Sequence, residues 1–277
     1  MTRPKLSIST LGCPNWDFIK TLQEFNKLGI DAMEVRGVDG QMDADKILRF
    51  KPENQAETKR LLKQYNVKMI GFGSSASFHN PDNVEQMIES TKREIDICSQ
   101  MDIPAIRVFG NDIPDPKKQD QTVKQVTEAL GQVAHYAAQK GMIVNLEIHG
   151  GFNTRETVEP IVQELKGEPG FGIIWDINHS DKTYKDNFKP FYDIIKPCLK
   201  HTHIKDYIRN DSGKWTLTLI GEGDIPIKPI MQLLKNEGYD GYYSFEWEKK
   251  WHPYLPEPEV AFPHFIKTFN KWWDELD

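Results

Sequence analysis

Eight short segments rich in apolar and β-branched residues recur along the chain, and a longer, more polar stretch separates each one from the next. Alternation of this kind is typical of βαβ units in a parallel sheet, because two parallel strands need a crossover of a dozen or more residues between them. This pattern constrains the fold more than any other feature of the sequence. It predicts strands at residues 6–12, 31–38, 68–75, 105–110, 142–150, 171–178, 199–207 and 242–248.

The intervening stretches carry apolar residues at helical spacing, for example in residues 58–65, 83–101, 121–141 and 227–238. Several end in a glycine directly before a strand, as in QKGMIVNLE, which indicates a glycine at the end of a helix. Eight βα units predict a (β/α)8 barrel that spans residues 1–277 as one domain. We expect a last helix at about 257–275 to pack on this barrel. An open doubly wound sheet is the alternative, but LGCPNW after the first strand lacks its glycine fingerprint.

Charge and composition exclude several kinds of partner. The net charge is −6 and no long basic run is present, so we expect no nucleic acid partner. The first residues do not resemble a signal peptide and no apolar run is long enough to span a membrane, which predicts a cytoplasmic protein without a membrane partner. Cys13, Cys98 and Cys198 are widely spaced and odd in number, so they are expected to be buried free thiols.

The carboxyl ends of the strands are where barrel enzymes place their active sites. Taking one polar residue near the end of each of the last four strands gives Glu147, Asp176, His203 and Glu246. Three carboxylates would repel one another in a buried cavity, so a bound cation is the natural neutraliser. This oxygen-rich set suits Mn²⁺ best, with Mg²⁺, Co²⁺ or Zn²⁺ as alternatives.

The run HTHIKD at residues 201–206 refines this picture. In a regular strand His201, His203 and Lys205 point to one side, and burying them without partners would cost several kcal/mol. We assign His203 to the metal and leave His201 between a core role and a supporting role. Lys205 is expected at the rim, where it either meets a substrate oxygen or forms a salt bridge. Asp206 points to the opposite side and is expected to support or cap a neighbouring segment.

Five segments in the same order resemble one known family. They are GIDAMEVRG, NLEIHGG, WDINH, HTHIKD followed by GEGDIP, and GYYSFEWE, and together they span nearly the whole chain. The chain resembles the xylose-isomerase-like barrel superfamily of sugar phosphate isomerases and epimerases. The resemblance implies that Glu147, Asp176, His203 and Glu246 bind one divalent metal, and that the two glutamates exchange protons with the substrate from opposite faces. It also implies that His179 and Arg209 contact the substrate.

Other residues near the strand ends have both a functional and a purely structural interpretation. Glu34 and Arg36 either belong to the site or pair with each other, and Glu248 is expected to be a solvated loop residue. GEGDIP is interpreted as a helix start, with Asp224 as the cap and Pro226 in the first turn, in preference to a phosphate site. The segment KKWHPYLPEP is long for a βα loop and is a candidate lid. Further substrate-binding candidates are Arg36, His149, His79, Trp16, Phe109 and Lys205.

These residues predict a metal-dependent sugar isomerase or epimerase that works through an enediolate, with Glu147 and Glu246 as acid and base. A dehydratase of an inosose or keto-sugar is the alternative in the same site. An endonuclease IV-like phosphodiesterase is less favoured, since VFGND after strand four lacks the histidine that the zinc cluster of that group uses. A non-catalytic sugar-binding barrel is a third class. The expected partner is a small sugar, and a homodimer or homotetramer is compatible with the resemblance.

Overall fold

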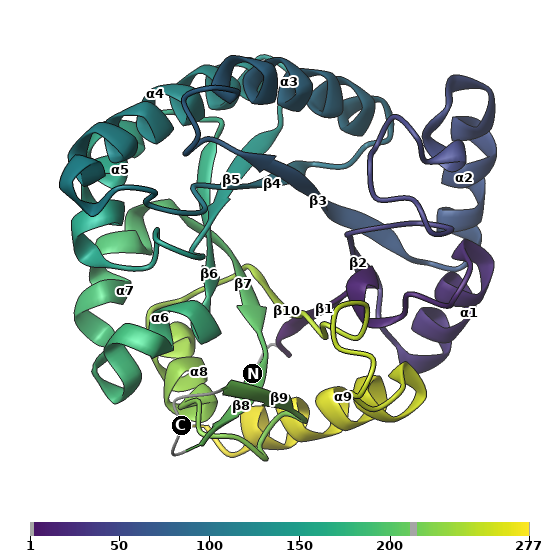
Figure 1. Cartoon of the computed structure of the whole chain (residues 1–277). Coiled ribbons are helices and arrows are strands. Elements are labelled where there is room, and N and C mark those ends of the chain that lie inside the picture. Colours follow the sequence, from purple (N-terminus) through teal and green to yellow (C-terminus); the bar gives the residue numbers. More distant parts are fainter. Residues whose placement is uncertain (1–2, 211–214, 277) are drawn as a thin grey trace.

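Parallel strands close into a barrel in the order β1, β10, β7, β6, β5, β4, β3, β2, which confirms the predicted (β/α)8 fold (Figure 1). The computed structural model describes residues 3–210 and 215–276. The barrel strands are β1 (Lys5–Ser9), β2 (Ala32–Val35), β3 (Lys68–Ser77), β4 (Ala105–Phe109), β5 (Ile143–Glu147), β6 (Phe171–Asp176), β7 (Leu199–Ile204) and β10 (Tyr242–Phe245).

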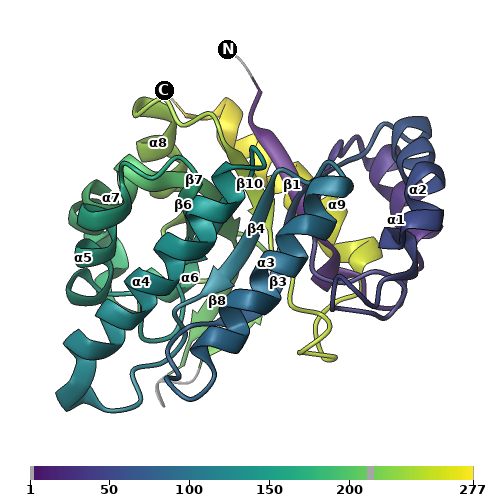
Figure 2. The same cartoon turned by 90° about the horizontal axis from the view of Figure 1, so that it is seen from above.

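Helices form a ring around the barrel, as Figure 1 shows along the barrel and Figure 2 from the side. They are α1 (Phe18–Leu28), α2 (Pro52–Gln64), α3 (Val84–Gln100), α4 (Gln119–Ala138), α5 (Arg155–Leu165), α6 (Ile177–Tyr184), α7 (Lys189–Ile195), α8 (Ile227–Asn236) and α9 (Pro258–Asp274). Among the described residues, no helix has both the length and the apolar character needed to cross a bilayer.

The last helix seals the barrel beside β10. In Figure 1, α9 lies in the outer ring between α8 and α1. Phe265 of α9 stacks on Phe245 of β10 with ring centroids 4.6 Å apart, and Phe269 packs on Tyr243 at 5.0 Å. The predicted helix at about 257–275 is therefore present. The three cysteines are buried and free, as expected.

Every barrel strand except β3 ends one to three residues before its predicted end, and for β6 and β7, which end at the candidate site, the structure shows the reason. β6 stops at Asp176 because its carboxylate accepts a hydrogen bond from the Asn178 amide at 2.9 Å and so begins α6. β7 stops at Ile204, and the chain turns into an antiparallel hairpin of β8 (Asp206–Arg209) and β9 (Trp215–Thr218). The predicted continuous strand 199–207 is thus two strands separated by Lys205.

The inside of this barrel is more polar than usual. TIM barrels generally fill the interior with bulky branched side chains, but here Ser7, Glu34, Asn145, His201 and Ser244 are all buried. The strand register aligns His203 with Ser244 on one side and with Asp176 on the other. The polar interior therefore continues directly into the predicted metal ligands.

Candidate metal centre and active site

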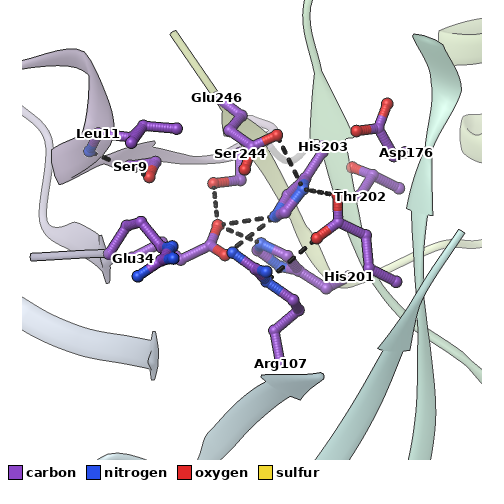
Figure 3. A network of polar contacts seen from close by, with 12 residues as sticks. Ser9, Leu11, Glu34, Arg107, Asp176, His201, Thr202, His203, Ser244 and Glu246 are labelled. Atoms are coloured by element: carbon purple, nitrogen blue, oxygen red, sulfur yellow. Dashed lines mark hydrogen bonds and ion pairs between the residues drawn. The ribbon is translucent and has the colours of Figure 1, made fainter. Parts of the chain in front are cut away.

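Four adjacent strands of the barrel present the four predicted ligands at one end. Glu147 ends β5, Asp176 ends β6, His203 lies in β7 and Glu246 follows β10 directly. One potential ligand atom from each lies within 4.8 Å of the others, and all four residues are buried. Figure 3 shows His203 between Glu246 and Glu34, with Asp176 nearby. The one-residue-per-strand reasoning thus selected residues that the fold brings together.

Unsatisfied atoms in this cluster indicate that it suits a cation. Within the described chain, Glu147 Oε2, Asp176 Oδ2 and His203 Nδ1 are buried without a hydrogen-bond partner. Arg107 lies 3.1 Å from that glutamate oxygen and Lys205 lies 2.9 Å from that aspartate oxygen, but neither contact is aligned as a hydrogen bond. Buried polar atoms are usually satisfied, and a divalent ion would satisfy all three.

Glu34 fixes the orientation of the His203 ring. His203 Nε2 lies 2.9 Å from Glu34 Oε1, and Ser244 Oγ donates to Glu34 Oε2 at 2.8 Å (Figure 3). Burial alone would raise the pKa of Glu34, but His203 and His201 outweigh it and hold that pKa well below its usual range. With Nε2 turned toward the carboxylate, Nδ1 is the atom that faces Glu147 and Glu246. The alternative pairing of Glu34 with Arg36 is wrong, because the carboxylate points into the barrel toward the histidines.

His201 belongs to the same network and lies deeper in the barrel than His203. Its Nε2 lies 3.1 Å from Glu34 Oε2. A cavity of about 410 Å³ at the opposite end of the barrel reaches both His201 and Glu34. Glu34, His201 and His203 also form a second group that could hold a metal. Because both histidines already contact the carboxylate at hydrogen-bond distance, we interpret His201 as a supporting residue of this network.

Lys205 lies inside the cluster and not at its rim. Its side chain is 1% exposed, and Nζ lies 2.5 Å from Glu246, 2.7 Å from Glu248 and 2.9 Å from Asp176. The chain leaves β7 at this residue, so the side chain can turn inward among the carboxylates. Burial opposes the charge of Lys205, but the nearby Asp176 and Glu246 outweigh it and raise the pKa well above the ordinary value. Lys205 is therefore a cationic partner of the acidic residues.

The position of Lys205 changes how we interpret two acidic residues, Glu248 and Asp176. Glu248 is not a solvated loop residue, since it binds Lys205 and its other oxygen lies 3.3 Å from His252. Burial raises the pKa of Asp176 to about 7, although Lys205 acts in the opposite direction. Without a cation, this carboxyl is therefore close to half protonated at neutral pH.

Arg107 belongs to the site and the sequence reasoning missed it. It lies in the middle of β4, where its Nε is 3.1 Å from Glu147 Oε2 and its guanidinium lies over the Phe109 ring at 4.0 Å. The signal was an arginine in the otherwise apolar strand AIRVF, on the same face as Phe109. Burial raises the pKa of Glu147, but Arg107 and His203 together outweigh it, so the net shift is downward.

A cavity of about 130 Å³, here called the mouth cavity, opens next to the cluster. Six of its residues were predicted for the site, namely Arg36, Phe109, Glu147, His149, Lys205 and Glu246. The others that line it are Leu11, Arg107, Glu248 and Trp251. The cavity thus joins the acidic cluster to cationic and aromatic side chains.

His149 and His179 form one wall beside this cavity. Their rings lie 3.9 Å apart, and Phe109 packs against His149 at 4.9 Å. Burial lowers the pKa of both histidines, and for His179 the proximity of His149 adds to the effect. Both rings are therefore neutral near pH 7 and can donate or accept a hydrogen bond.

Three predicted substrate contacts lie elsewhere in the described structure. Arg209 pairs with Asp181 of α6 from the β8–β9 hairpin. Trp16 donates to Glu259 at 3.2 Å and lines a neighbouring hollow, which shares Leu11 and Arg36 with the mouth cavity. His79 follows β3 and is not one of the residues that line the mouth cavity.

The GEGDIP segment is organised by Asp206. This carboxylate accepts hydrogen bonds from the amides of Gly221 at 2.8 Å, Gly223 at 3.1 Å and Ile225 at 3.2 Å. A carboxylate therefore occupies the amides that a phosphate would need, which agrees with the interpretation of Asp206 as a support. The predicted cap Asp224 instead accepts from the Arg209 amide, and α8 begins after Pro226.

A family model described as the xylose isomerase-like TIM barrel matches residues 22–267. This covers most of the chain. The chain belongs to the xylose isomerase-like TIM barrel family. The family assignment confirms the resemblance inferred from the five sequence segments.

Relatives within this barrel family include enzymes of more than one reaction class. An inosose dehydratase of Klebsiella pneumoniae is 26% identical, with 92% of each chain covered. The solved structure of IolI, described with a bound zinc atom, has a TM-score of 0.81 at 18% identity and 99% coverage of both chains. The 3-keto-D-glucoside 4-epimerase of E. coli has a TM-score of 0.73 at 16% identity, with 98% of this chain and 100% of that chain covered. The two structures establish the shared fold.

Proposed function

We propose that this xylose isomerase-like barrel is a divalent-metal-dependent enzyme that moves a proton at a carbon next to the carbonyl of a keto-sugar or inosose. The net reaction we favour is epimerisation or isomerisation. The observation that carries the proposal is the placement of Glu147 and Glu246 at the two ends of the four-strand arc that holds the ligands. A substrate at the cluster would meet one carboxylate on each side.

The ionisation of the two glutamates supports this role. Burial would raise the pKa of Glu246, but His203 and Lys205 outweigh it and hold the pKa well below the usual range. Arg107 lowers the pKa of Glu147 in the same way. Both are therefore carboxylates near neutral pH, and a carboxylate within reach of an acidified C–H can act as a general base.

Glu147, Asp176, His203 and Glu246 would hold the metal, with Mn²⁺ as our first choice. A divalent ion there supplies positive charge next to the oxygen on which negative charge develops when the proton leaves. The chain's own residues move the protons: one glutamate removes the proton, and the other, after it has taken up a proton from solvent, delivers it from the opposite side. The first glutamate then releases its proton to solvent. His149 and His179 can hydrogen-bond sugar hydroxyls, while Phe109 offers an apolar surface to the sugar ring.

Dehydration is the second candidate, and two observations favour it. The matched inosose dehydratase covers almost the whole chain. In addition, Lys205 places a buried ammonium beside Glu246 and Glu248, where it can donate a hydrogen bond to a departing hydroxyl. In this reaction a glutamate removes the proton, a carbon–carbon double bond forms next to the carbonyl, and the hydroxyl on the next carbon leaves as water with the proton that the glutamate took up.

Product analysis separates the two reactions. Metal-loaded protein is incubated with a panel of ketoses, keto-glycosides and inososes, and the products are followed by NMR and by absorbance. A new ketose of unchanged mass supports epimerisation, and an aldose of unchanged mass supports isomerisation. Loss of one water with an enone absorbance supports the dehydratase. No conversion of any ketone by metal-loaded protein would refute both.

A further inference from the structure

Arg36 lies at the edge of the site, where the charges of Glu246, Glu147 and Glu94 favour its cationic form without any of them forming an ion pair with it. It follows β2, lines the mouth cavity, and donates from Nη2 to the Ser75 hydroxyl at 2.9 Å. Its Nη1 is buried without a hydrogen-bond partner in the described structure, and no carboxylate of residues 3–210 or 215–276 forms an ion pair with it. Buried charges are normally paired, so this guanidinium has unused binding capacity.

A second guanidinium lies directly beside Arg36. A Cβ placed on Gly73 would come within 2.7 Å of Arg36 Cδ and 2.9 Å of Arg107 Nη2. The two arginines therefore approach each other over a glycine that leaves room for both. Their proximity is unfavourable, since burial and the charge of Arg107 together lower the pKa of Arg36 to about 10.

The carboxylates of the cluster do not resolve this repulsion. Glu147 is engaged by Arg107 and Glu246 by Lys205. Arg107 also keeps Nη1 buried and without a hydrogen-bond partner in the described chain. Both guanidinium groups thus retain an Nη1 without an acceptor, and both arginines line the mouth cavity.

We propose that Arg36, together with Arg107, binds an anionic substituent of the substrate, a carboxylate or a phosphate group, beside the reacting carbon. The planar fork of arginine matches two oxygens of either group. Of the two adjacent guanidinium groups only that of Arg107 has a carboxylate at ion-pair distance, and an anionic ligand would supply the second. This proposal rests on the proposed function and narrows its substrate class to acidic keto-sugars.

Matched, unreactive ligands test the subsite without turnover. Sorbitol, gluconate and sorbitol 6-phosphate share one carbon chain and differ in the anionic group that they carry. Isothermal titration of Mn²⁺-loaded protein should give at least one of the two anions an affinity about tenfold or more above that of sorbitol. The preferred anion identifies the substituent as carboxylate or phosphate. Arg36→Met should remove the advantage, and Arg36→Lys should retain part of it, because it keeps the charge but loses the fork.

Controls separate this subsite from direct binding of the anion to the metal. An anion bound only by the metal would keep its advantage in Arg36→Met, and that result overturns the proposal, as does equal binding of all three ligands. Arg60→Met, on the exposed face of α2, should leave the anion preference unchanged. Mn²⁺ affinity and circular dichroism of each variant check that the centre and the fold persist.

The subsite and the proposed function can fail separately. Anion binding that depends on Arg36, without proton exchange on any ketone, would leave the subsite standing and refute the proposed function. Proton exchange on neutral ketones, without an anion preference, would refute the subsite and leave the proposed function standing.

Discussion

His203 Nε2 lies 2.9 Å from Glu34 Oε1, while Nδ1 of the same ring lies 3.3 Å from Glu246 and 3.5 Å from Glu147. One imidazole thus connects the polar interior of the barrel to the candidate metal centre. A carboxylate that accepts the outer N–H of a ligating histidine fixes its tautomer and increases its basicity. Glu34 has this position with respect to His203.

Glu34→Gln should therefore weaken metal binding by about tenfold to a hundredfold. The glutamine removes the negative charge that keeps Nδ1 available as a ligand. Isothermal titration with Mn²⁺ and with Zn²⁺ measures the effect. Ser244→Ala, which removes one hydrogen bond to the same carboxylate, should have a smaller effect in the same direction. Unchanged affinity in Glu34→Gln would show that Glu34 does not support the centre.

Lys205→Met should destabilise the metal-free protein far more than the metal-loaded protein. Removing the ammonium leaves Asp176, Glu246 and Glu248 without their shared cation, and breaking a buried ion pair costs about 3–5 kcal/mol. A bound divalent cation should recover much of this loss. Urea denaturation with and without Mn²⁺ measures both quantities.

The matched control for that experiment is Lys189→Met. Lys189 pairs with Asp193 on the exposed surface of α7, and such pairs contribute less than about 1 kcal/mol. This variant should have nearly the same free energy of unfolding as the unmodified chain, with or without metal. If Mn²⁺ stabilised Lys205→Met no more than the unmodified protein, Lys205 would not be a substitute for the cation.

Metal affinity should fall as the pH is lowered, first because His203 takes up a proton and then, below about pH 7, because Asp176 does so as well. The pKa of Asp176 is raised to about 7 by burial, and Glu246 and Glu34 outweigh burial to raise the pKa of His203. Both groups must lose a proton to bind a cation. Each of them therefore weakens metal binding about tenfold for every pH unit below its own pKa. Dissociation constants at several pH values give the slope. Asp176→Asn should bind metal more weakly and with a shallower slope, and an equally steep slope would contradict the assignment.

Asp206→Ala should destabilise the fold without changing metal affinity. The substitution leaves the amides of Gly221, Gly223 and Ile225 without their acceptor, and hydrogen bonds to a charged group contribute about 1.5–3 kcal/mol each. Chemical denaturation and Mn²⁺ titration of the same variant check the two parts. A large loss of metal affinity would mean that Asp206 acts on the centre and not only on the loop.

The sequence was sufficient for the barrel and for the cluster of Glu147, Asp176, His203 and Glu246, because both depend on local periodicity. Alternation along each strand put Glu147, Asp176 and His203 on inward faces, and the fold places strand ends together. The partner of Glu34 could not be predicted in this way. β2 and β7 are not neighbours in the barrel, so the contact with His203 depends on the barrel's cross-section.

Side-chain direction at the end of a strand was the other source of error. Alternation placed Lys205 on the same side as His203, but at the rim, whereas its ammonium is buried among Asp176, Glu246 and Glu248. Arg209 follows the break after β7 into a hairpin, where it meets Asp181. Arg107 was missed because the search concentrated on strand ends, whereas its long side chain reaches Glu147 from the middle of β4.

Deuterium uptake tests the central claim most directly. Metal-loaded protein and a keto-sugar panel are incubated in D₂O, and NMR locates deuterium on the carbon skeleton. The account predicts deuterium at a carbon next to the carbonyl, abolished or strongly reduced in Glu246→Gln under conditions where that variant still binds Mn²⁺, and largely retained in Glu24→Gln on the outer face of α1. Exchange that continues unchanged in Glu246→Gln would contradict the account, as would its absence from every ketone with the metal-loaded protein.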